Sequence, residues 1–417
     1  MKKMTNVIAV FGYNNSRIYD VEKIKNMALE KFGAEILLIK EHVDKQDLSV
    51  TRFCFDAQPE RSDLEGPLRV YLKSENLNLI GCLPFSDKGV IGAAHTAKAF
   101  GLFGDDDRTA KAMLDKHLFR ELEAKIPMDP SVYRKPFFKK IHDADELLAF
   151  FERTGTFFIK PASEGNSRGC MKISSRNDLL LWLEENAPYL KNGVICEEYL
   201  SSGNEFSFDG VNGSYWVTEK YTTEGAYRAE YQHIVPAPLD EALELTMQNT
   251  LRPLLTNLGS RGGAFHHEFF NLTDSRLASV EPNRRPAGMW IWDLAAWSFE
   301  NFNPWATWLE VCAGKKPTAS ALKRVFFSGV RGVISSIDGT IAHIDEIAIR
   351  DQFTEIFGSE NFRFSILKQV NSIVRRDARD NADFLAYVAL RHKDALTLKN
   401  NLALANEIVL KNIEVCP

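Results

Sequence analysis

The N-terminal hundred or so residues alternate between short apolar runs and helical patterns. Val7–Phe11 and Glu35–Ile39 are apolar runs typical of buried strands, and apolar residues recur at helical spacing over Val21–Phe32. Leu77–Pro84 predicts a further strand, and the alanine-rich stretch Val90–Phe100 predicts a further helix. A strand, a helix and a strand in this order indicate a parallel βαβ unit. We therefore expect an open parallel α/β domain, Rossmann-like in outline.

A turn at Gly12–Asn15 follows the first predicted strand. The turn lacks the GxGxxG pattern of a dinucleotide-binding loop, but a loop at the carboxyl end of a parallel strand can still line a ligand crevice. Gly101–Asp107 is rich in glycine and aspartate and predicts the first domain boundary. The pattern of Arg108–Ala124 predicts one charged amphipathic helix.

From Phe157 onward the pattern changes to short apolar strands separated by turn signals, which is typical of antiparallel sheet. Apolar residues at helical spacing over Ala395–Asn412 predict a terminal helix. The chain is therefore expected to join an α/β domain to α+β domains. The predicted strands are Phe157–Lys160, Cys170–Ile173, Val194–Glu198, Glu205–Val211 and Tyr215–Tyr221.

A lysine and a loop of small residues follow the first of these strands. Lys160 closes the strand. Unhindered backbone N–H groups in such a loop can donate to phosphate oxygens while the ammonium neutralises their charge. A plain hairpin with an exposed lysine explains the same residues about as well, because glycine and serine turns are common. The candidate phosphate-binding positions in the loop are Ser163, Gly165, Ser167 and Gly169.

Two acidic segments follow on the next strands. Glu197, Glu198, Tyr199 and Leu200 close one strand, and Glu205 opens the next. Backbone N–H and C=O groups at a strand-to-loop junction can bind adenine, and a carboxylate a few residues later can accept hydrogen bonds from ribose hydroxyls. Taken alone, this segment is better explained by solvated acids at a sheet edge.

Glu268 lies inside an apolar strand, and a second acidic segment follows after a turn. The two segments can pair as a hairpin, and the period of two places Glu281, Asn283 and Arg285 on one face, where they can meet the first acid. Two carboxylates and an amide oxygen suit Mg²⁺, and the arginine would stabilise charge during phosphoryl transfer. The alternative is an ion-paired cluster of glutamate and arginine, and Pro282 argues against a central strand.

Two aromatic pairs flank these acids. His266 and His267 are adjacent on a strand and face opposite sides, so at most one of them points into a site. A packed or supporting role is expected for each. Trp290 and Trp292 are expected in the core, although one of the pair can line a substrate pocket.

Composition and charge limit the class of protein. With 417 residues the chain exceeds what one hydrophobic core usually serves, so two or three domains are expected. A net charge of −5 gives no positive field that would attract nucleic acid or an anionic membrane. No apolar stretch approaches the length of a membrane span. The six cysteines are scattered, and the apolar run after the charged N-terminus is too short for a signal peptide. We expect a cytoplasmic protein with reduced thiols.

Taken in order, these segments resemble the ATP-grasp superfamily, and within it the branch of amino-acid ligases of the bacilysin-synthetase kind. The similarity runs from about Asn78 to Leu294, half of the chain. Pro84–Asp87 and Phe100–Gly104 resemble the end of the family's N-terminal domain, and Asp115–Arg120 resembles its nucleotide-binding helix. The Lys160 loop, the acidic segments and the two metal-binding strands then follow in the family's order. Each segment alone is a weak signal, but six in order are specific.

The resemblance implies three parts of the chain. Residues 1–104 form the N-terminal α/β domain, 105–196 the small subdomain of the ATP-grasp fold, and 197–417 its large subdomain with a C-terminal region that caps the substrate. Both subdomains are expected to be α+β.

The resemblance also implies a chemistry. A small-molecule carboxylate attacks the γ-phosphate of ATP to give an acyl phosphate and ADP, and an amine then displaces phosphate to form an amide. An amino acid is the expected substrate, and a homodimer is the default expectation. The implied roles are phosphate binding by Lys116 and Lys160, binding of Mg²⁺ (or Mn²⁺) by Glu268, Glu281 and Asn283, and catalysis by Arg285 and Lys160.

Two other functions stay open from the sequence. An ATP-grasp enzyme can act on bicarbonate or on a nucleotide-precursor carboxylate. A protein of this fold can also bind ATP as a regulator without turnover, although all the metal-ligand positions here carry competent residues.

Overall fold

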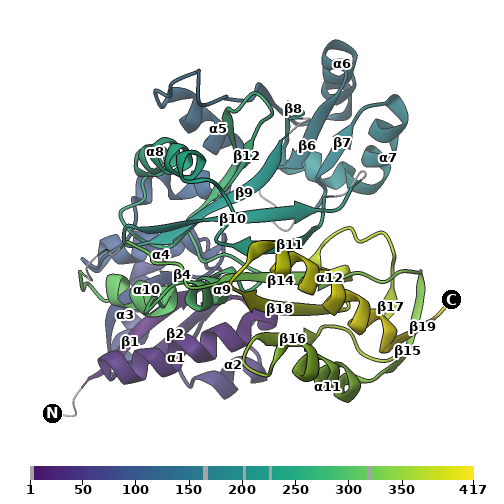
Figure 1. Cartoon of the computed structure of the whole chain (residues 1–417). Coiled ribbons are helices and arrows are strands. Elements are labelled where there is room, and N and C mark those ends of the chain that lie inside the picture. Colours follow the sequence, from purple (N-terminus) through teal and green to yellow (C-terminus); the bar gives the residue numbers. More distant parts are fainter. Residues whose placement is uncertain (1–3, 163–167, 201–202, 225–227, 317–318, 320) are drawn as a thin grey trace.

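The computed structural model describes residues 4–162, 168–200, 203–224, 228–316, 319 and 321–417. The strands of these residues form four sheets. Figure 1 shows the N-terminal part at the lower left, a small sheet with its helices at the top, and a long sheet running between them and the C-terminal part. No helix among the described residues is both long enough and apolar enough to cross a membrane.

The N-terminal part is a parallel sheet with helices. Its strand order is β3-β2-β1-β4, so the order reverses between β1 and β4, and the predicted parallel α/β domain is confirmed. The loops after these two strands therefore lie at a topological switch point, where open α/β sheets bind ligands. The elements are β1 (Thr5–Phe11), η1 (Asn15–Arg17), α1 (Ile18–Phe32), β2 (Glu35–Lys40), α2 (Lys45–Val50), β3 (Cys54–Asp56), α3 (Glu65–Ser74), β4 (Leu77–Pro84) and α4 (Gly89–Ala99).

Two glycines allow the loops after β1 and β4 to approach each other. A Cβ at Gly89 would lie 2.2 Å from the carbonyl oxygen of Phe11, which is closer than real atoms come. Gly12 has φ +73°, and a Cβ there would lie 2.8 Å from Ser86 Oγ. The close packing of the loops at the switch point therefore depends on both glycines.

The segment after the N-terminal sheet is two helices, η2 (Asp107–Met113) and α5 (Lys116–Lys125). The prediction of one continuous helix here was wrong because Asp115 starts a new one. Its carboxylate accepts hydrogen bonds from the backbone N–H groups of His117 and Leu118, at 2.9 and 3.2 Å. A capping aspartate satisfies N–H groups that a helix start leaves unpaired. Lys116 consequently lies in the first turn of α5.

The small sheet is antiparallel, with the order β5-β8-β6-β7. Its apolar face packs against two helices through a cluster that includes Phe150, Phe157 and Trp182. The elements are β5 (Phe138–Ile141), α6 (Ala144–Thr154), β6 (Phe157–Pro161), β7 (Met171–Ile173), α7 (Arg176–Asn186), η3 (Ala187–Asn192) and β8 (Val194–Glu198).

The large sheet has the order β13-β12-β9-β10-β11-β14-β18-β16, and its printed pairs are antiparallel. The predicted hairpin is β12 with β13, in register at Glu268 and Glu281. β13 is an edge strand, which explains how it accommodates Pro282. The elements are β9 (Asn204–Val211), β10 (Ser214–Thr222), β11 (Glu230–Val235), α8 (Glu241–Asn257), β12 (Phe265–Asn271), β13 (Leu277–Asn283), α9 (Ile291–Ser298), α10 (Pro304–Cys312), β14 (Phe327–Val333), β16 (Phe362–Ile366) and β18 (Ala386–His392).

The C-terminal part ends in the predicted helix, followed by a strand that was not predicted. The helix, α12, packs on the large sheet through Leu398 and Leu402. The elements are β15 (Gly339–Ile344), α11 (Glu346–Phe357), β17 (Ile373–Val374), η4 (Asn381–Asp383), α12 (Ala395–Lys411) and β19 (Ile413–Cys416). The three-part division at residues 104 and 196 stays a prediction.

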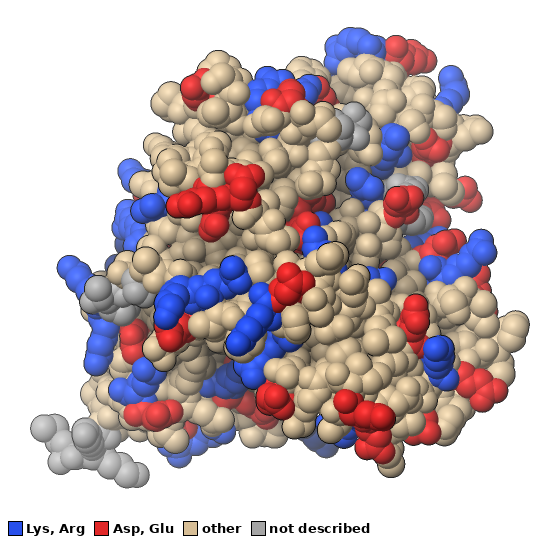
Figure 2. Space-filling model, in the orientation of Figure 1, with Lys and Arg blue, Asp and Glu red and all other residues tan. Residues whose placement is uncertain are grey.

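One hydrophobic cluster joins the N-terminal sheet to the large sheet. It contains Val10 and Phe85 together with Trp292 and Trp305, and Trp290 packs against it, as expected for core tryptophans. The switch-point loops and the large sheet are therefore fixed relative to each other. On the surface, Figure 2 shows acidic and basic side chains interspersed over one face of the molecule.

Candidate active site

A cavity of about 540 Å³ opens where the N-terminal sheet, the small sheet and the large sheet meet. The loops after β1 and β4 form one wall, as expected at the switch point. Residues of β6 and β8 contribute the second wall, and residues of β9, β11, β12 and β13 the third. The predicted site residues that line the cavity are Lys116, Lys160, Glu197, Glu198, Tyr199, Leu200, Glu205, Glu268, Glu281 and Arg285.

The other predicted positions do not line this cavity or are not described. Asn283 Nδ2 donates to Glu281 Oε1 at 2.9 Å, which places it directly behind the cavity wall. Gly169 is held away from the lining, and its carbonyl accepts a hydrogen bond from Trp182 Nε1 at 2.8 Å. The predicted positions Ser163, Gly165 and Ser167 lie outside the described residues.

Apolar side chains of the small sheet and the large sheet line the same cavity. Phe158, Tyr199 and Leu200 come from the small sheet and the loop after it, and Phe270 and Val280 come from the large sheet. The rings of Phe158 and Tyr199 stack with centroids 6.5 Å apart. Flat apolar surfaces of this kind suit an aromatic ring system such as a purine base.

Lys160 is held at the cavity by a buried acid. Its Nζ lies 2.8 Å from Glu197 Oε2, and Arg120 Nε lies 2.7 Å from the other carboxylate oxygen. Burial raises the pKa of Glu197, but the two cations lower it by more than burial raises it. The pKa is therefore lowered to about 2. Glu197 is therefore ionised and positions Lys160. The carboxylate of Glu197 is already paired with two cations.

Arg120 links this pair to the large sheet. It donates to Glu123 Oε2 at 2.7 Å and to the carbonyl oxygen of Ser279 at 2.8 Å. Tyr133 bonds both the acid and the Ser279 hydroxyl, and His267 Nε2 lies 2.7 Å from the same hydroxyl. The sequence analysis missed Arg120, although it lies four residues after Lys116 and thus on the same face of α5.

The second predicted lysine contacts the predicted metal ligands. Lys116 Nζ lies 3.0 Å from Glu281 Oε2. Burial disfavours both charges, but the attraction between the two side chains is stronger than this effect. The pKa of Lys116 is therefore raised and the pKa of Glu281 is lowered. Glu268 lies opposite Glu281 in the strand register, and Asn283 bonds the latter acid. The structure thus brings the three predicted metal ligands together beside Lys116.

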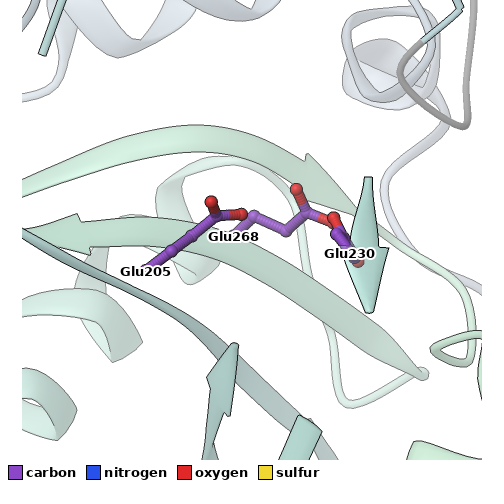
Figure 3. Close-up of side chains that lie close together, drawn as sticks. All are labelled: Glu205, Glu230 and Glu268. Carbon is purple, nitrogen blue, oxygen red and sulfur yellow. The ribbon is translucent and has the colours of Figure 1, made fainter. Parts of the chain in front are cut away.

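A third lysine, which the sequence analysis missed, lies among three carboxylates. Lys220 Nζ is 3.0 Å from Glu205, 2.7 Å from Glu230 and 3.2 Å from Glu268. Figure 3 shows these acids close together, with one oxygen from each within 4.8 Å of the others. Burial opposes the charge of the lysine, but the acids raise its pKa well above the ordinary value. A sequence signal existed, because Lys220 shares the inward face of its strand with Trp216.

A histidine supports the shared acid of this cluster. His266 Nε2 lies 3.0 Å from Glu268 Oε1, and its Nδ1 lies 2.7 Å from Asp209. Burial opposes protonation, but the two acids raise the pKa of His266 to about 9. His267 faces the opposite side, and burial lowers its pKa to about 3. As expected, only one of the two histidines lines the cavity.

Sequence comparison finds partial relatives. No protein-family model matches the chain. It is 28% identical over 166 residues to a D-alanine–D-alanine ligase of Neisseria meningitidis, which covers 36% of this chain and 52% of the ligase. The chain therefore spans about half the length of the curated relatives that it matches.

Solved structures match over the whole chain. An L-amino acid ligase from Bacillus licheniformis aligns with a TM-score of 0.76 and 16% identity, covering 100% of this chain and 99% of that one. N5-carboxyaminoimidazole synthetase from Staphylococcus aureus, complexed with ADP, aligns with a TM-score of 0.67 and 14% identity, covering 97% and 99%. The chain therefore shares the fold of this ligase and this synthetase. The fold class expected from the sequence is confirmed.

The site offers oxygen donors that fit a magnesium ion. Glu268 and Glu281 are carboxylates, and Asn283 adds an amide oxygen. Hard oxygen donors of this kind are those that Mg²⁺ prefers. Glu281 is paired with Lys116 at 3.0 Å, whereas Glu268 shares Lys220, at 3.2 Å, with two other carboxylates.

Arg285 reaches the cavity from beyond the end of β13. It makes a two-pronged contact with Asp87 of the loop after β4, with Nε 2.8 Å from Oδ1 and Nη2 3.1 Å from Oδ2. Burial disfavours the guanidinium charge, but Asp87 raises the pKa of the arginine above its ordinary value. Asp87 was not predicted as a site residue, since its partner lies 198 residues away in the chain.

Proposed function

We propose that the chain is an ADP-forming carboxylate–amine ligase that binds ATP with Mg²⁺ and uses an amino acid as one substrate. One arrangement carries the proposal. Lys116 and Lys160 line one cavity with the oxygen donors Glu268 and Glu281, and the buried Lys220 lies 3.2 Å from Glu268. Cations and metal-binding oxygens of this kind suit a nucleotide triphosphate, whose transfer chemistry depends on positioning and charge neutralisation.

The nucleotide would lie with its base against Phe158, Leu200 and the other apolar lining residues. Lys116 and Lys160 would bind the phosphate oxygens, and Glu268, Glu281 and Asn283 would hold Mg²⁺. When bound, the metal supplies positive charge to the phosphates.

The reaction needs two substitutions and no nucleophile from the protein. A carboxylate oxygen of the substrate attacks the γ-phosphorus, the bond to the β-phosphate oxygen breaks, and ADP leaves. The amine then attacks the acyl carbon, phosphate leaves with the carboxylate oxygen, and the amine nitrogen loses a proton. Arg285 would stabilise the anionic phosphoryl group during both steps, and walls contributed by three sheets would limit access of water to the acyl phosphate.

An amino acid substrate is supported by the cavity and by the relatives. Glu230 lines the cavity, with Oε1 2.7 Å from Lys220 Nζ and Oε2 3.6 Å from His233 Nε2. Its carboxylate can accept a hydrogen bond from an ammonium group in the cavity. The printed names of the relatives include a D-alanine–D-alanine ligase and an L-amino acid ligase. A cytoplasmic location and a homodimer belong to the same proposal, and six free cysteines accord with a reducing compartment.

A second candidate is an enzyme that acts on bicarbonate or a nucleotide-precursor carboxylate. The similarity to N5-carboxyaminoimidazole synthetase favours it. The two candidates differ in the substrate that starts ATP turnover.

The proposal is tested by a panel of amino-acid pairs with ATP and Mg²⁺, in which ADP and phosphate are measured together. We expect release of both products only when a carboxylate and an amine are present, and loss of release when EDTA is added. AMP with pyrophosphate would contradict the proposal. Turnover that needs bicarbonate and no amino acid would favour the second candidate, and ATP binding without any turnover would favour a regulatory protein.

A further inference from the structure

Among the described residues the cavity is lined by five arginines, Arg17, Arg120, Arg168, Arg228 and Arg285, and the proposed reaction gives no role to Arg17. Arg285 follows β13, whereas Arg17 is the last residue of η1, directly before α1. The side chain of Arg17 is only 20% exposed. Arg17 lies near the switch point of the N-terminal sheet, where open α/β sheets bind ligands.

Arg17 is held in place by contacts on its face and its edges. Its Cζ lies 4.4 Å from the centroid of the Phe85 ring. Its Nε lies 3.0 Å from Asp20 Oδ2, and its Nη2 lies 3.3 Å from the carbonyl oxygen of Ala287. A planar donor group fixed in this way is preorganised to bind a carboxylate or a phosphate.

The ion pairs around Arg17 contain one more cation than anion. Asp20 also lies 3.0 Å from Lys23, which in turn lies 2.7 Å from Asp293. Arg363 is 3.6 Å from the same Asp293. Three cations therefore share two carboxylates, and of these cations Arg17 is the one that lines the cavity.

Arg285 lies close enough to repel Arg17, although Asp87 pairs with Arg285. The pKa of Arg17 lies below its ordinary value, because burial disfavours the cation, and Arg285 repels it; Asp20 offsets these effects only in part. A negative group between the two guanidiniums and the solvent would stabilise both charges.

We propose that Arg17 binds a second carboxylate, which one of the two substrates carries in addition to the reacting group. The inference rests on the proposed function, because it takes Arg285 as the partner of the reacting phosphoryl group. Two kinds of substrate bring such a group. One is an acyl donor with two acidic groups, and the other is an amine that has its own carboxylate, as an amino acid does.

Calorimetry with the full chain, Mg²⁺ and AMP-PNP tests the inference with succinate and butyrate, which have the same number of carbons. We expect the wild type to bind the dianion about tenfold more tightly than the monoanion, as one charged hydrogen-bonded contact provides. Arg17→Gln should remove that difference and leave butyrate binding at the wild-type level, and Arg17→Lys should retain part of it. Equal binding of the two acids by the wild type, or an equal loss of both in Arg17→Gln, overturns the inference.

Lys31→Gln is a matched control, because Lys31 lies on the adjoining helix α1 and pairs with Glu310 at 2.8 Å, away from the cavity lining. It should behave as the wild type. Thermal unfolding of each variant shows whether the fold is kept. If Arg17→Gln does not fold, Arg17→Lys decides alone: a preference for succinate that is smaller than in Lys31→Gln supports the inference, and a preference equal to that of Lys31→Gln overturns it.

Turnover identifies which substrate carries the second anion. L-Glutamate against L-glutamine tests the acyl donor, and L-alanine against L-alaninamide tests the amine. A loss in Arg17→Gln confined to the charged member of one pair supports the inference and names the source, whereas an equal loss with all four overturns it. AMP-PNP binding is measured first in the wild type, since its absence contradicts the proposed function rather than the role of Arg17.

Discussion

Glu281→Gln is expected to lower kcat/KM for ATP-dependent ligation by about 10³-fold. The substitution keeps the size of the side chain but removes its charge. Lys116 then loses the carboxylate at 3.0 Å, and the proposed metal site loses one of its two charged ligands. The concentration of Mg²⁺ needed for half-maximal activity should rise as well. Steady-state phosphate release at several Mg²⁺ concentrations measures both effects.

Glu310→Gln provides the control for this variant, because it removes the same charge from an ion pair outside the cavity lining. Its activity should stay within about twofold of the wild type, since surface pairs contribute little. If Glu281→Gln kept activity within about tenfold of the wild type while folding normally, the acid would not hold a metal in the reaction.

Arg120→Met is expected to reduce the free energy of unfolding by about 3–5 kcal/mol, because it leaves the buried Glu123 without its cation and the buried Glu197 with Lys160 alone. Arg120 is 1% exposed, and both Glu123 and Glu197 lie 2.7 Å from it. Loss of the arginine also releases the acid that positions Lys160, so the KM for ATP should rise. Urea unfolding and steady-state kinetics measure the two effects.

Lys125→Met tests whether these effects belong to the buried network rather than to helix α5 itself. Lys125 is exposed near the end of the same helix. Its substitution should change the free energy of unfolding by less than about 0.5 kcal/mol. A loss below about 1 kcal/mol in Arg120→Met would mean that the acids find other partners.

Much of the fold could be predicted because its signals are local. The apolar run of β1 and the helical spacing of α1 determine these elements within a few residues. The hairpin of Glu268 and Glu281 follows from two apolar segments around a turn, and it brings together the predicted metal ligands. The break before α5 was missed because the prediction followed apolar spacing alone. In the structure Asp115 caps the start of α5 and thereby separates this helix from η2.

The rest of the site depends on pairings between distant segments. Lys220 is surrounded by acids from β9, β11 and β12, and the strand order that brings these together cannot be deduced from local pattern. Likewise, Arg120 lies 77 residues from Glu197 in the chain, and Asp87 lies 198 residues from Arg285. The roles of such buried polar residues depend on the residues that they contact in the folded chain, and no periodicity in the sequence indicates these contacts.

Transfer of an oxygen atom from the substrate to phosphate tests most directly whether this cavity activates a carboxylate with ATP. The enzyme is supplied with the carboxylate substrate labelled with ¹⁸O, together with unlabelled ATP, and the released phosphate is analysed by mass spectrometry. Attack of the carboxylate on the γ-phosphorus predicts phosphate that carries a single labelled oxygen, with ADP as the second product. Unlabelled phosphate, or label in AMP, would contradict activation through an acyl phosphate.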